Sequence, residues 1–243
     1  MERALDVLRC FETAGGELGV TEIANRTGLS VSTAHRLTRA LCAGGLLVQD
    51  PRTERYQLGP ALVVLGRRAE EQLGYARALP ALESLADKTG ESVNLGIRSG
   101  SEVLVVLDVA SPQPLRFAQA PGSRVAMHAS AMGKCLLAFG PDPAASVRGL
   151  GELTRFTERT LADPAALESD LSAIRRRGWA LNDEERNPGA RAIAAPVLDR
   201  AGVAVAAVAV QGPTLRLVDE RLDELAALLV ETTRGLAPLL APG

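Results

Sequence analysis

The segment from Thr21 to Gly45 constrains the fold most, because it has the punctuation of two short helices joined by a tight turn. The stretch "TEIANRTG" begins at Thr21, a suitable N-terminal cap, and Gly28 ends it. The next stretch, "SVSTAHRLTRALCAGG", begins at the cap Ser30 and stops at Gly44. Two helices with this spacing predict a helix-turn-helix unit.

The second of these helices divides its residues between two faces. Ala34, Leu37 and Leu41 recur at helical spacing and are expected to pack inward. The other face is polar and basic. An α-helix fits the major groove of DNA, where arginine donates to guanine edges or phosphates, and hydroxyl groups at a helix N-terminus suit a phosphate. We therefore predict DNA contacts from the polar residues of this helix: Ser32, Thr33, His35, Arg36 and Arg39.

A hairpin is predicted directly after this helix. In "LLVQDPRTERYQLG", apolar residues alternate on both sides of a turn at Asp50-Pro51. A helix, a turn, a polar-faced helix and a hairpin follow one another in winged helix-turn-helix domains. We expect Arg52 and Arg55 of the hairpin to contact phosphate or the minor groove. The basic surface must be local, because the net charge of the whole chain is −2.

Residues 60–91 return to a helical pattern, which is interrupted near Gly74 and at Pro80. We expect two helices here, and the domain boundary near Gly74. The predicted organisation is a winged helix-turn-helix domain over residues 1–59, a linker helix over residues 60–74 and a second domain over residues 75–243.

The second domain is predicted to be of the α+β class, on a largely antiparallel sheet. Strands are expected at "SVNLGI", "VLVVLDV", "LRFAQA", "WALN", "AIAAPVL" and "VAVAAVAV". Only the four residues "DRAG" join the last two strands, so they must pair antiparallel. Helices are expected near Ser130, from Asp163 to Gly178 and from Val218 onward.

Composition excludes several classes of protein. The three cysteines are far apart and lack CxxC spacing, so neither a disulfide scaffold nor a zinc site is expected. The first residues carry charge where a signal peptide has an apolar run, and the longest apolar run, residues 203–210, is too short to span a bilayer. We expect a cytoplasmic protein with no membrane contact, no metal and no cofactor.

The stretch "HASAMGKCLLA", residues 128–138, allows three interpretations. A phosphate-binding loop would need glycine where His128 stands and a hydroxyl where Cys135 stands. A serine nucleophile would need a lysine three residues on, but Ser130 and Lys134 are four apart. The third interpretation is a helix that begins near Ser130 and either binds a carboxylate at its N-terminus or simply packs on the sheet. The residues alone leave that last choice open.

Two other charged stretches favour structural roles. "NDEERNPGAR" contains Asp183, Glu184 and Glu185, but consecutive acids project in different directions, so a solvated loop is favoured over a metal site. The arginines at 175–177 are best explained as the end of a helix, where positive charge complements the helix dipole.

Taken together, the chain resembles the IclR-type family of bacterial transcription regulators over nearly its whole length. Six separated blocks in the family's order carry the resemblance: "RALDVLRCF", "TEIANRTGLSVSTAHRLTRAL", "YQLGPALVVLG", "MHASAMGKCLLA", "GWALNDEERNPGARAIAAPVLD" and "VAVQGP". The resemblance implies a winged helix-turn-helix, a linker helix and a GAF-like effector domain. It also implies a homodimer that pairs into tetramers.

The resemblance further implies an effector pocket at the start of the "HASAMGKCLLA" helix. Backbone groups at Ala131 and Met132, beside Ser130, would hold a small carboxylate-bearing metabolite. The other implied ligand-facing positions are Phe117, Val125, Asn182, Ala190, Ala192, Ala209 and Gln211. Some members carry an aspartate or small polar residues at four of these positions. We therefore expect a larger, more apolar organic acid here, with aromatic acids among the candidates.

The predicted function is a ligand-responsive transcription regulator, a repressor or an activator, and not an enzyme. It would bind double-stranded operator DNA at paired half-sites, because one helix and one wing read few bases. The main alternative is an enzyme of small organic acids whose N-terminal domain serves association. A second is a DNA-binding protein whose C-terminal domain only assembles.

Overall fold

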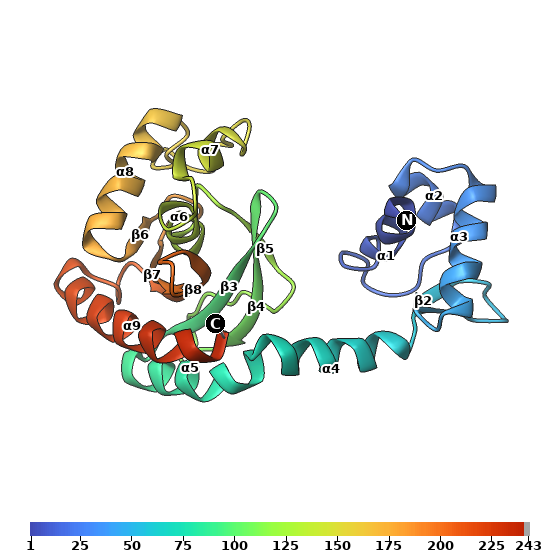
Figure 1. The fold of residues 1–243 in the computed structure, drawn as a ribbon, viewed down its shortest axis with the longest axis horizontal. Helices are drawn as coiled ribbons and strands as arrows, with labels where there is room; N and C mark the ends of the chain where they lie inside the picture. Colours follow the sequence, from blue (N-terminus) through green and yellow to red (C-terminus); the bar gives the residue numbers. More distant parts are fainter. Residues whose placement is uncertain (241–243) are drawn as a thin grey trace. The chain divides into compact units, whose positions relative to one another are not determined.

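The structure is a computed structural model that describes residues 1–240 (Figure 1). The chain divides into two compact units, Met1–Leu73 and the part from Gly74 onward. Among the described residues, no helix is both long and apolar enough to cross a membrane.

The first unit contains four helices and one hairpin among its described elements. In chain order they are α1 (Glu2–Arg9), α2 (Val20–Thr27), α3 (Val31–Ala43), β1 (Leu47–Gln49), β2 (Tyr56–Leu58) and α4 (Ala61–Leu73). The predicted turn between α2 and α3 is present, with Gly28 in the left-handed conformation at φ 66°. The Ser30 hydroxyl caps α3 by accepting the N–H of Thr33 at 3.3 Å.

The start of α2 differs from the prediction. The helix begins at Val20, with Gly19 as its N-terminal cap, and not after Thr21. The carboxylate of Glu22 accepts the N–H of Gly19 at 2.7 Å. This side-chain bond extends the helix toward the N-terminus, because it satisfies a backbone donor that a helix start leaves unpaired.

The hairpin is tied to the rest of the first unit by its second strand. Tyr56 is 1% exposed and belongs to the core formed with Ile23, Ala34 and Leu47. Its backbone also exchanges two hydrogen bonds with Leu18, of 2.9 and 2.8 Å. An isolated β-bridge therefore holds the loop before α2 against the hairpin.

The second unit contains a six-stranded antiparallel sheet in the order β5-β4-β3-β8-β7-β6. Its strands are β3 (Ser92–Ser99), β4 (Glu102–Val109), β5 (Arg124–Ala126), β6 (Ala180–Asp183), β7 (Ala190–Leu198) and β8 (Ala204–Pro213). Its helices are α5 (Tyr75–Thr89), α6 (Ala131–Ala138), α7 (Pro143–Arg148), α8 (Pro164–Arg177) and α9 (Asp219–Leu240).

The helices cover both faces of this sheet (Figure 1). On one face α5 and α9 lie side by side and bury a core rich in Leu and Val, including Leu82, Val208 and Leu229. On the other face α6 lies against β7 and β8, with α8 packed behind it. Since both faces are covered, the central strand β8 is almost entirely apolar, whereas its neighbour β3 also buries the polar Ser92 and Asn94.

Two sequence expectations for this unit need correction, and one helix was not expected. Residues 115–120, expected as a strand, form no strand, and β5 lies further along. The carbonyl oxygens of Leu115 and Phe117 accept from the side chains of Arg216 and Gln211 and not from a neighbouring strand, which accounts for the irregular loop. Pro80 does not interrupt α5, because near the helix start a proline removes one internal hydrogen bond only. The short helix α7 had no counterpart in the sequence interpretation.

Two glycines permit close backbone contacts in this unit. Gly74, which precedes α5, has φ 76°, and a Cβ atom there would lie 2.4 Å from the carbonyl oxygen of Leu239 at the end of α9. Gly133, in the first turn of α6, lies against the backbone of Met127, whose carbonyl oxygen would be 2.2 Å from an added Cβ.

The Gly133 contact yields a stability prediction. Gly133→Ala should lower the free energy of unfolding by about 2–3 kcal/mol, because the rigid Met127 backbone cannot move aside. The matched control is Gly235→Ala in the middle of α9, where an added Cβ meets nothing within 4 Å. That variant should gain about 0.5–1 kcal/mol from helix propensity. Denaturant unfolding followed by fluorescence of the single Trp179 reports on this unit. Equal stability of the two variants would contradict the contact.

Candidate functional site

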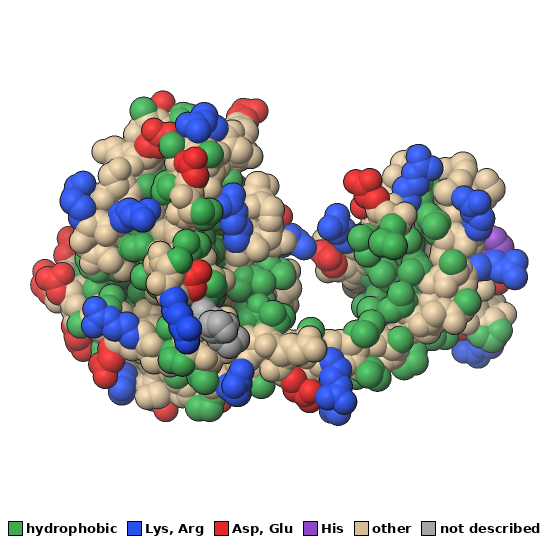
Figure 2. Space-filling model, viewed as in Figure 1, with side chains coloured by type: hydrophobic (Ala, Val, Ile, Leu, Met, Phe, Trp, Pro, Cys, Tyr) green, Lys and Arg blue, Asp and Glu red, His purple; other side chains and the backbone are tan. Residues whose placement is uncertain are grey.

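The outward face of α3 carries the residues predicted to contact DNA. Ser32, His35, Arg36 and Arg39 are exposed, and Thr33 is half-buried, while Ala34 and Leu41 on the opposite face are buried. No other described residue bonds the side chains of Arg36 and Arg39. Figure 2 shows basic side chains along this face, and in the first unit all of these are arginines. The helix thus presents arginines that are not committed to the domain itself.

The two hydroxyl groups at the start of α3 lie close to the N-terminal cap. The Oγ of Ser32 lies 3.1 Å from the Oγ of Ser30, and the Oγ1 of Thr33 lies 2.9 Å from the same atom. These hydroxyls therefore cluster where the helix dipole is positive, a suitable place for a phosphate.

The two wing arginines have different surroundings. Arg52 is exposed; within the described residues only its backbone N–H has a partner, the Asp50 carboxylate at 2.7 Å. Arg55 instead donates to Glu22 at 2.7 Å and to the carbonyl oxygen of Glu17 at 2.8 Å. The Gly19 N–H and then the Arg55 charge lower the pKa of Glu22. Arg55 thus fastens the wing to α2, and the sequence pattern had not indicated this partner.

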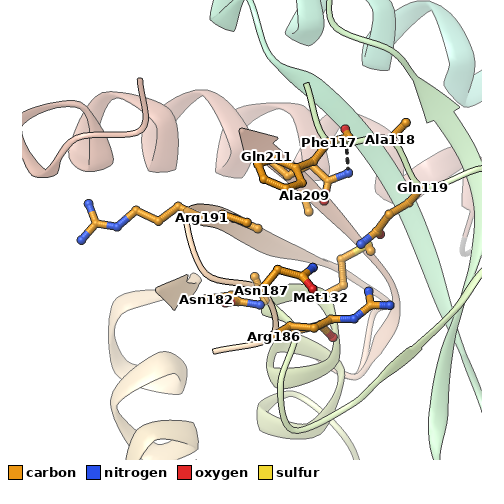
Figure 3. Close-up of a pocket in the computed structure, with 14 residues that line it drawn as sticks. Phe117, Ala118, Gln119, Met132, Asn182, Arg186, Asn187, Arg191, Ala209 and Gln211 are labelled. Carbon is orange, nitrogen blue, oxygen red and sulfur yellow. Dashed lines mark hydrogen bonds between the residues drawn. The ribbon is translucent and has the colours of Figure 1, made fainter. Parts of the chain in front are cut away.

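A pocket of about 150 Å³ opens in the second unit, where the N-terminus of α6 meets the ends of β7 and β8 (Figure 3). The loop before β5 and the loop between β6 and β7 form its other walls. Nine of the ten predicted effector residues line it: Phe117, Ser130, Ala131, Met132, Asn182, Ala190, Ala192, Ala209 and Gln211. Val125 is the exception, since it is 2% exposed in the core beneath α6 and is not part of the pocket lining.

The first turn of α6 supplies free backbone donors to this pocket. The Ser130 hydroxyl accepts the N–H of Gly133 at 3.1 Å and donates to the carbonyl oxygen of Ala126 at 2.8 Å. The N–H groups of Ala131 and Met132 have no acceptor within the described part of the chain. They lie at the positive end of the helix dipole, so the pocket offers an anion two N–H donors.

Five lining residues were not anticipated from the sequence: Ala118, Gln119, Arg186, Asn187 and Arg191. Arg186 is partly buried, and no described carboxylate pairs with it; burial lowers the pKa of its guanidinium. Gln119 enters from the opposite wall, and its buried Oε1 atom has no hydrogen-bond partner within residues 1–240. The ends of these two side chains face one another across the pocket (Figure 3).

Arg191 lines the pocket through its stem only. Its guanidinium points away (Figure 3) and donates to Asp219 at 2.7 Å and to the carbonyl oxygen of Leu217 at 3.0 Å. It also bonds Asp183, and that hydrogen bond lowers the pKa of Asp183. Arg191 therefore joins β7 to β6 and to the start of α9.

A buried ion pair lies directly behind the pocket. The Nζ atom of Lys134 lies 2.6 Å from Glu185 and 2.9 Å from Asp170 of α8, and the lysine side chain is 2% exposed. The prediction of a solvated loop is thus wrong for Glu185, which is 6% exposed because Lys134 holds it inside. Desolvation nevertheless raises the pKa of Glu185, and Lys134 opposes that shift.

Asn182 connects this ion pair to the pocket wall. Its Oδ1 accepts the N–H of Glu185 at 2.9 Å, and its Nδ2 donates to the carbonyl oxygen of Ala129 at 2.8 Å. Both ends of the amide are therefore occupied by the fold itself.

The catalytic interpretations of the "HASAMGKCLLA" stretch find no support in this geometry. Cys135 is completely buried, and burial raises the pKa of its thiol to about 12, so it stays protonated near neutral pH. Lys134 is held by two carboxylates. In residues 1–240 no three His, Cys, Asp or Glu side chains converge as a metal site would require.

Comparison with known proteins agrees with this arrangement along the whole chain. The model of the C-terminal domain of bacterial IclR transcriptional regulators matches residues 75–237, and the model of the IclR helix-turn-helix domain matches residues 1–51. The chain belongs to the IclR family of bacterial transcription regulators. The predicted family, the mixed α/β fold class and the DNA-binding regulator function are thereby confirmed for this IclR protein.

Three relatives show the extent of the similarity. The transcriptional regulator BhcR of Paracoccus denitrificans is 43% identical, over 100% of this chain and 87% of that protein. The glycerol operon regulatory protein of Streptomyces griseus is 41% identical, over 89% and 85%. An IclR homolog from Microbacterium hydrocarbonoxydans, solved in complex with 4-hydroxybenzoate, is 26% identical with a TM-score of 0.84, over 98% and 97%. All three are regulators by name or family.

The buried ion pair of this IclR protein leads to a second stability prediction. Lys134→Met should lower the free energy of unfolding by about 3–5 kcal/mol, because Glu185 is left charged and unpaired in the interior. Lys134→Met combined with Glu185→Gln should recover part of that loss. The control is Lys88→Met, since Lys88 is exposed on α5 and should change stability by less than about 0.5 kcal/mol. Similar unfolding curves for both lysine variants would refute a stabilising pair.

Proposed function

We propose that this protein is a one-component regulator whose binding to operator DNA responds to a small organic acid. The observation that carries the choice of ligand is the pocket at α6. There, two N–H groups without acceptors, at Ala131 and Met132, lie in one cavity with the unpaired, partly buried Arg186. A partly desolvated cation beside free helix donors is stabilised by an anion.

The dimensions of the pocket limit the size of the acid. A cavity of about 150 Å³ holds a molecule of about the size of benzene. Phe117, Met132 and Ala209 supply apolar surface, and the relative bound to 4-hydroxybenzoate shows that the fold accepts an aromatic acid. We therefore propose acids up to the size of a monocyclic aromatic acid. The pocket residues put forward for this role are the nine predicted ones that line it, together with Gln119 and Arg186.

DNA would be bound by a homodimer at paired half-sites, through the exposed residues of α3 and Arg52 of the wing. The linker helix α4 supports association, because Val63, Val64 and Leu65 are 57–65% exposed and no residue of α4 is buried. Exposed apolar residues of this density mark contact surfaces. We further propose that dimers pair into tetramers, and that the regulator acts in the cytoplasm, where the operator DNA lies.

The DNA contacts are tested by two arginine variants in a gel-shift titration against the DNA upstream of the protein's own gene. Arg36→Ala should weaken specific binding by about 1–3 kcal/mol and relax the base preference at one position of each half-site. Arg52→Ala should weaken all sequences alike and reduce the salt dependence of binding. Arg200→Ala, on an exposed turn of the second unit, is the control. Equal loss of sequence discrimination in the Arg36 and Arg52 variants would contradict the assignment.

The effector pocket is tested by calorimetric titration of the full chain with benzoate, 4-hydroxybenzoate, propionate and lactate. Arg186→Gln should weaken the acids that bind by at least about 10-fold, because a charge-assisted hydrogen bond is worth about 1.5–3 kcal/mol. Arg200→Gln keeps the same change of charge away from the pocket and should leave the affinity unaltered. Unchanged affinity in Arg186→Gln would exclude this pocket as the acid site.

A further inference from the structure

The polar side chains of the pocket fall into two groups. The fold itself occupies Ser130 and both ends of the Asn182 amide. Gln211 donates to the carbonyl oxygen of Phe117 at 3.2 Å. Two partly buried polar side chains of the pocket, Arg186 and Gln119, have no hydrogen-bond partner in residues 1–240. Asn187 is exposed.

We infer that Gln119 makes the pocket selective for hydroxy acids over the same acids without the hydroxyl group. This inference rests on the proposed function and refines its ligand class. The carboxylate would lie at Arg186 and the α6 N-terminus, and the hydroxyl would lie at the Gln119 amide, which faces Arg186 from the opposite wall (Figure 3).

The unpaired state of Gln119 has an energetic consequence. Its Oε1 atom has no exposed surface and no hydrogen-bond partner in residues 1–240, so a ligand in the pocket reaches the amide through its Nε2 group, and covering that group without a hydrogen bond is costly. Reversing the amide would present its carbonyl oxygen to the pocket in place of the NH₂ group. A hydroxyl group satisfies either orientation, because it both donates and accepts.

Hydrogen bonds hold the backbone of the loop that carries Gln119, and this fixes where its side chain enters the pocket. The backbone oxygen of Gln119 accepts from Nδ2 of Asn94 at 3.4 Å, and Asn94 is itself held by Asp108 at 2.6 Å. Further along the loop, Arg216 donates to the carbonyl oxygen of Leu115 at 2.9 Å and to Glu91 at 2.7 Å. Strands β3 and β4, the residue before β3 and the segment after β8 thus hold the loop in place.

A polar group held in a fixed position discriminates strongly between an acid that carries a hydroxyl group and the same acid without it. An acid without the hydroxyl would leave the Gln119 amide buried and unpaired, and sites built to bond a hydroxyl reject its deoxy analogue for this reason. A preference of at least about 10-fold is expected, which corresponds to one neutral hydrogen bond.

The experiment measures dissociation constants by calorimetry for two matched pairs, 4-hydroxybenzoate with benzoate and lactate with propionate. The wild-type chain should prefer the hydroxy acid of whichever pair fits the pocket by about 10-fold or more. Gln119→Leu should reduce that preference to less than about 2-fold, mainly by weakening the hydroxy acid. Gln113→Leu, an exposed position on the same loop, is the control and should keep the preference.

The outcomes separate this inference from the proposed function. If acids bind, and Arg186→Gln weakens them, but the wild type shows no preference within a pair, selectivity by Gln119 is refuted while the acid pocket stands. A preference that survives in Gln119→Leu refutes it equally. Binding of none of the four acids to the wild type would overturn both.

Discussion

The buried contact between Lys134, Glu185 and Asp170 holds together three elements beside the pocket. Lys134 belongs to α6, Asp170 to α8 and Glu185 to the loop after β6, so one ammonium group joins three elements. The residue after Glu185 is Arg186, which this anchoring places at the pocket. Two acids balance one buried cation, and the fold tolerates this because Asp170 remains 22% exposed and partly hydrated.

The polar side chains of the pocket are of two kinds: some are bonded within the protein, and others are free to bond a ligand. Asn182 and Ser130 line the pocket, yet their hydrogen bonds close the wall and shape it. Arg186 and Gln119 line the pocket without such bonds. A pocket built in this way is preorganised, because binding need not break an internal bond of the wall before a ligand contact forms.

Much of the fold could be predicted from local chemistry. Gly28, Ser30, Asp163 and Gly178 are helix punctuation that acts within one turn, and the structure places helix ends at each. Nine pocket residues could be predicted because the family resemblance covers the segments that bear them. Gln119 and Arg186 could not be predicted as pocket residues. Only the folded structure shows that no distant group pairs with their side chains. The errors at Glu185 and at residues 115–120 have the same origin, in partners 51 residues away for Glu185 and about 94 for the loop.

The contact between Gly74 and Leu239 constrains the length of α9. This helix starts at Asp219, which is bonded to Arg191 of the pocket, and its last turn meets the glycine where the second unit begins. Its 22 residues act as a strut of roughly 33 Å, at 1.5 Å per residue. One inserted residue would turn the far end by about 100° and carry Leu239 away from Gly74. Helical phase, and not composition alone, therefore limits which changes this helix can accept.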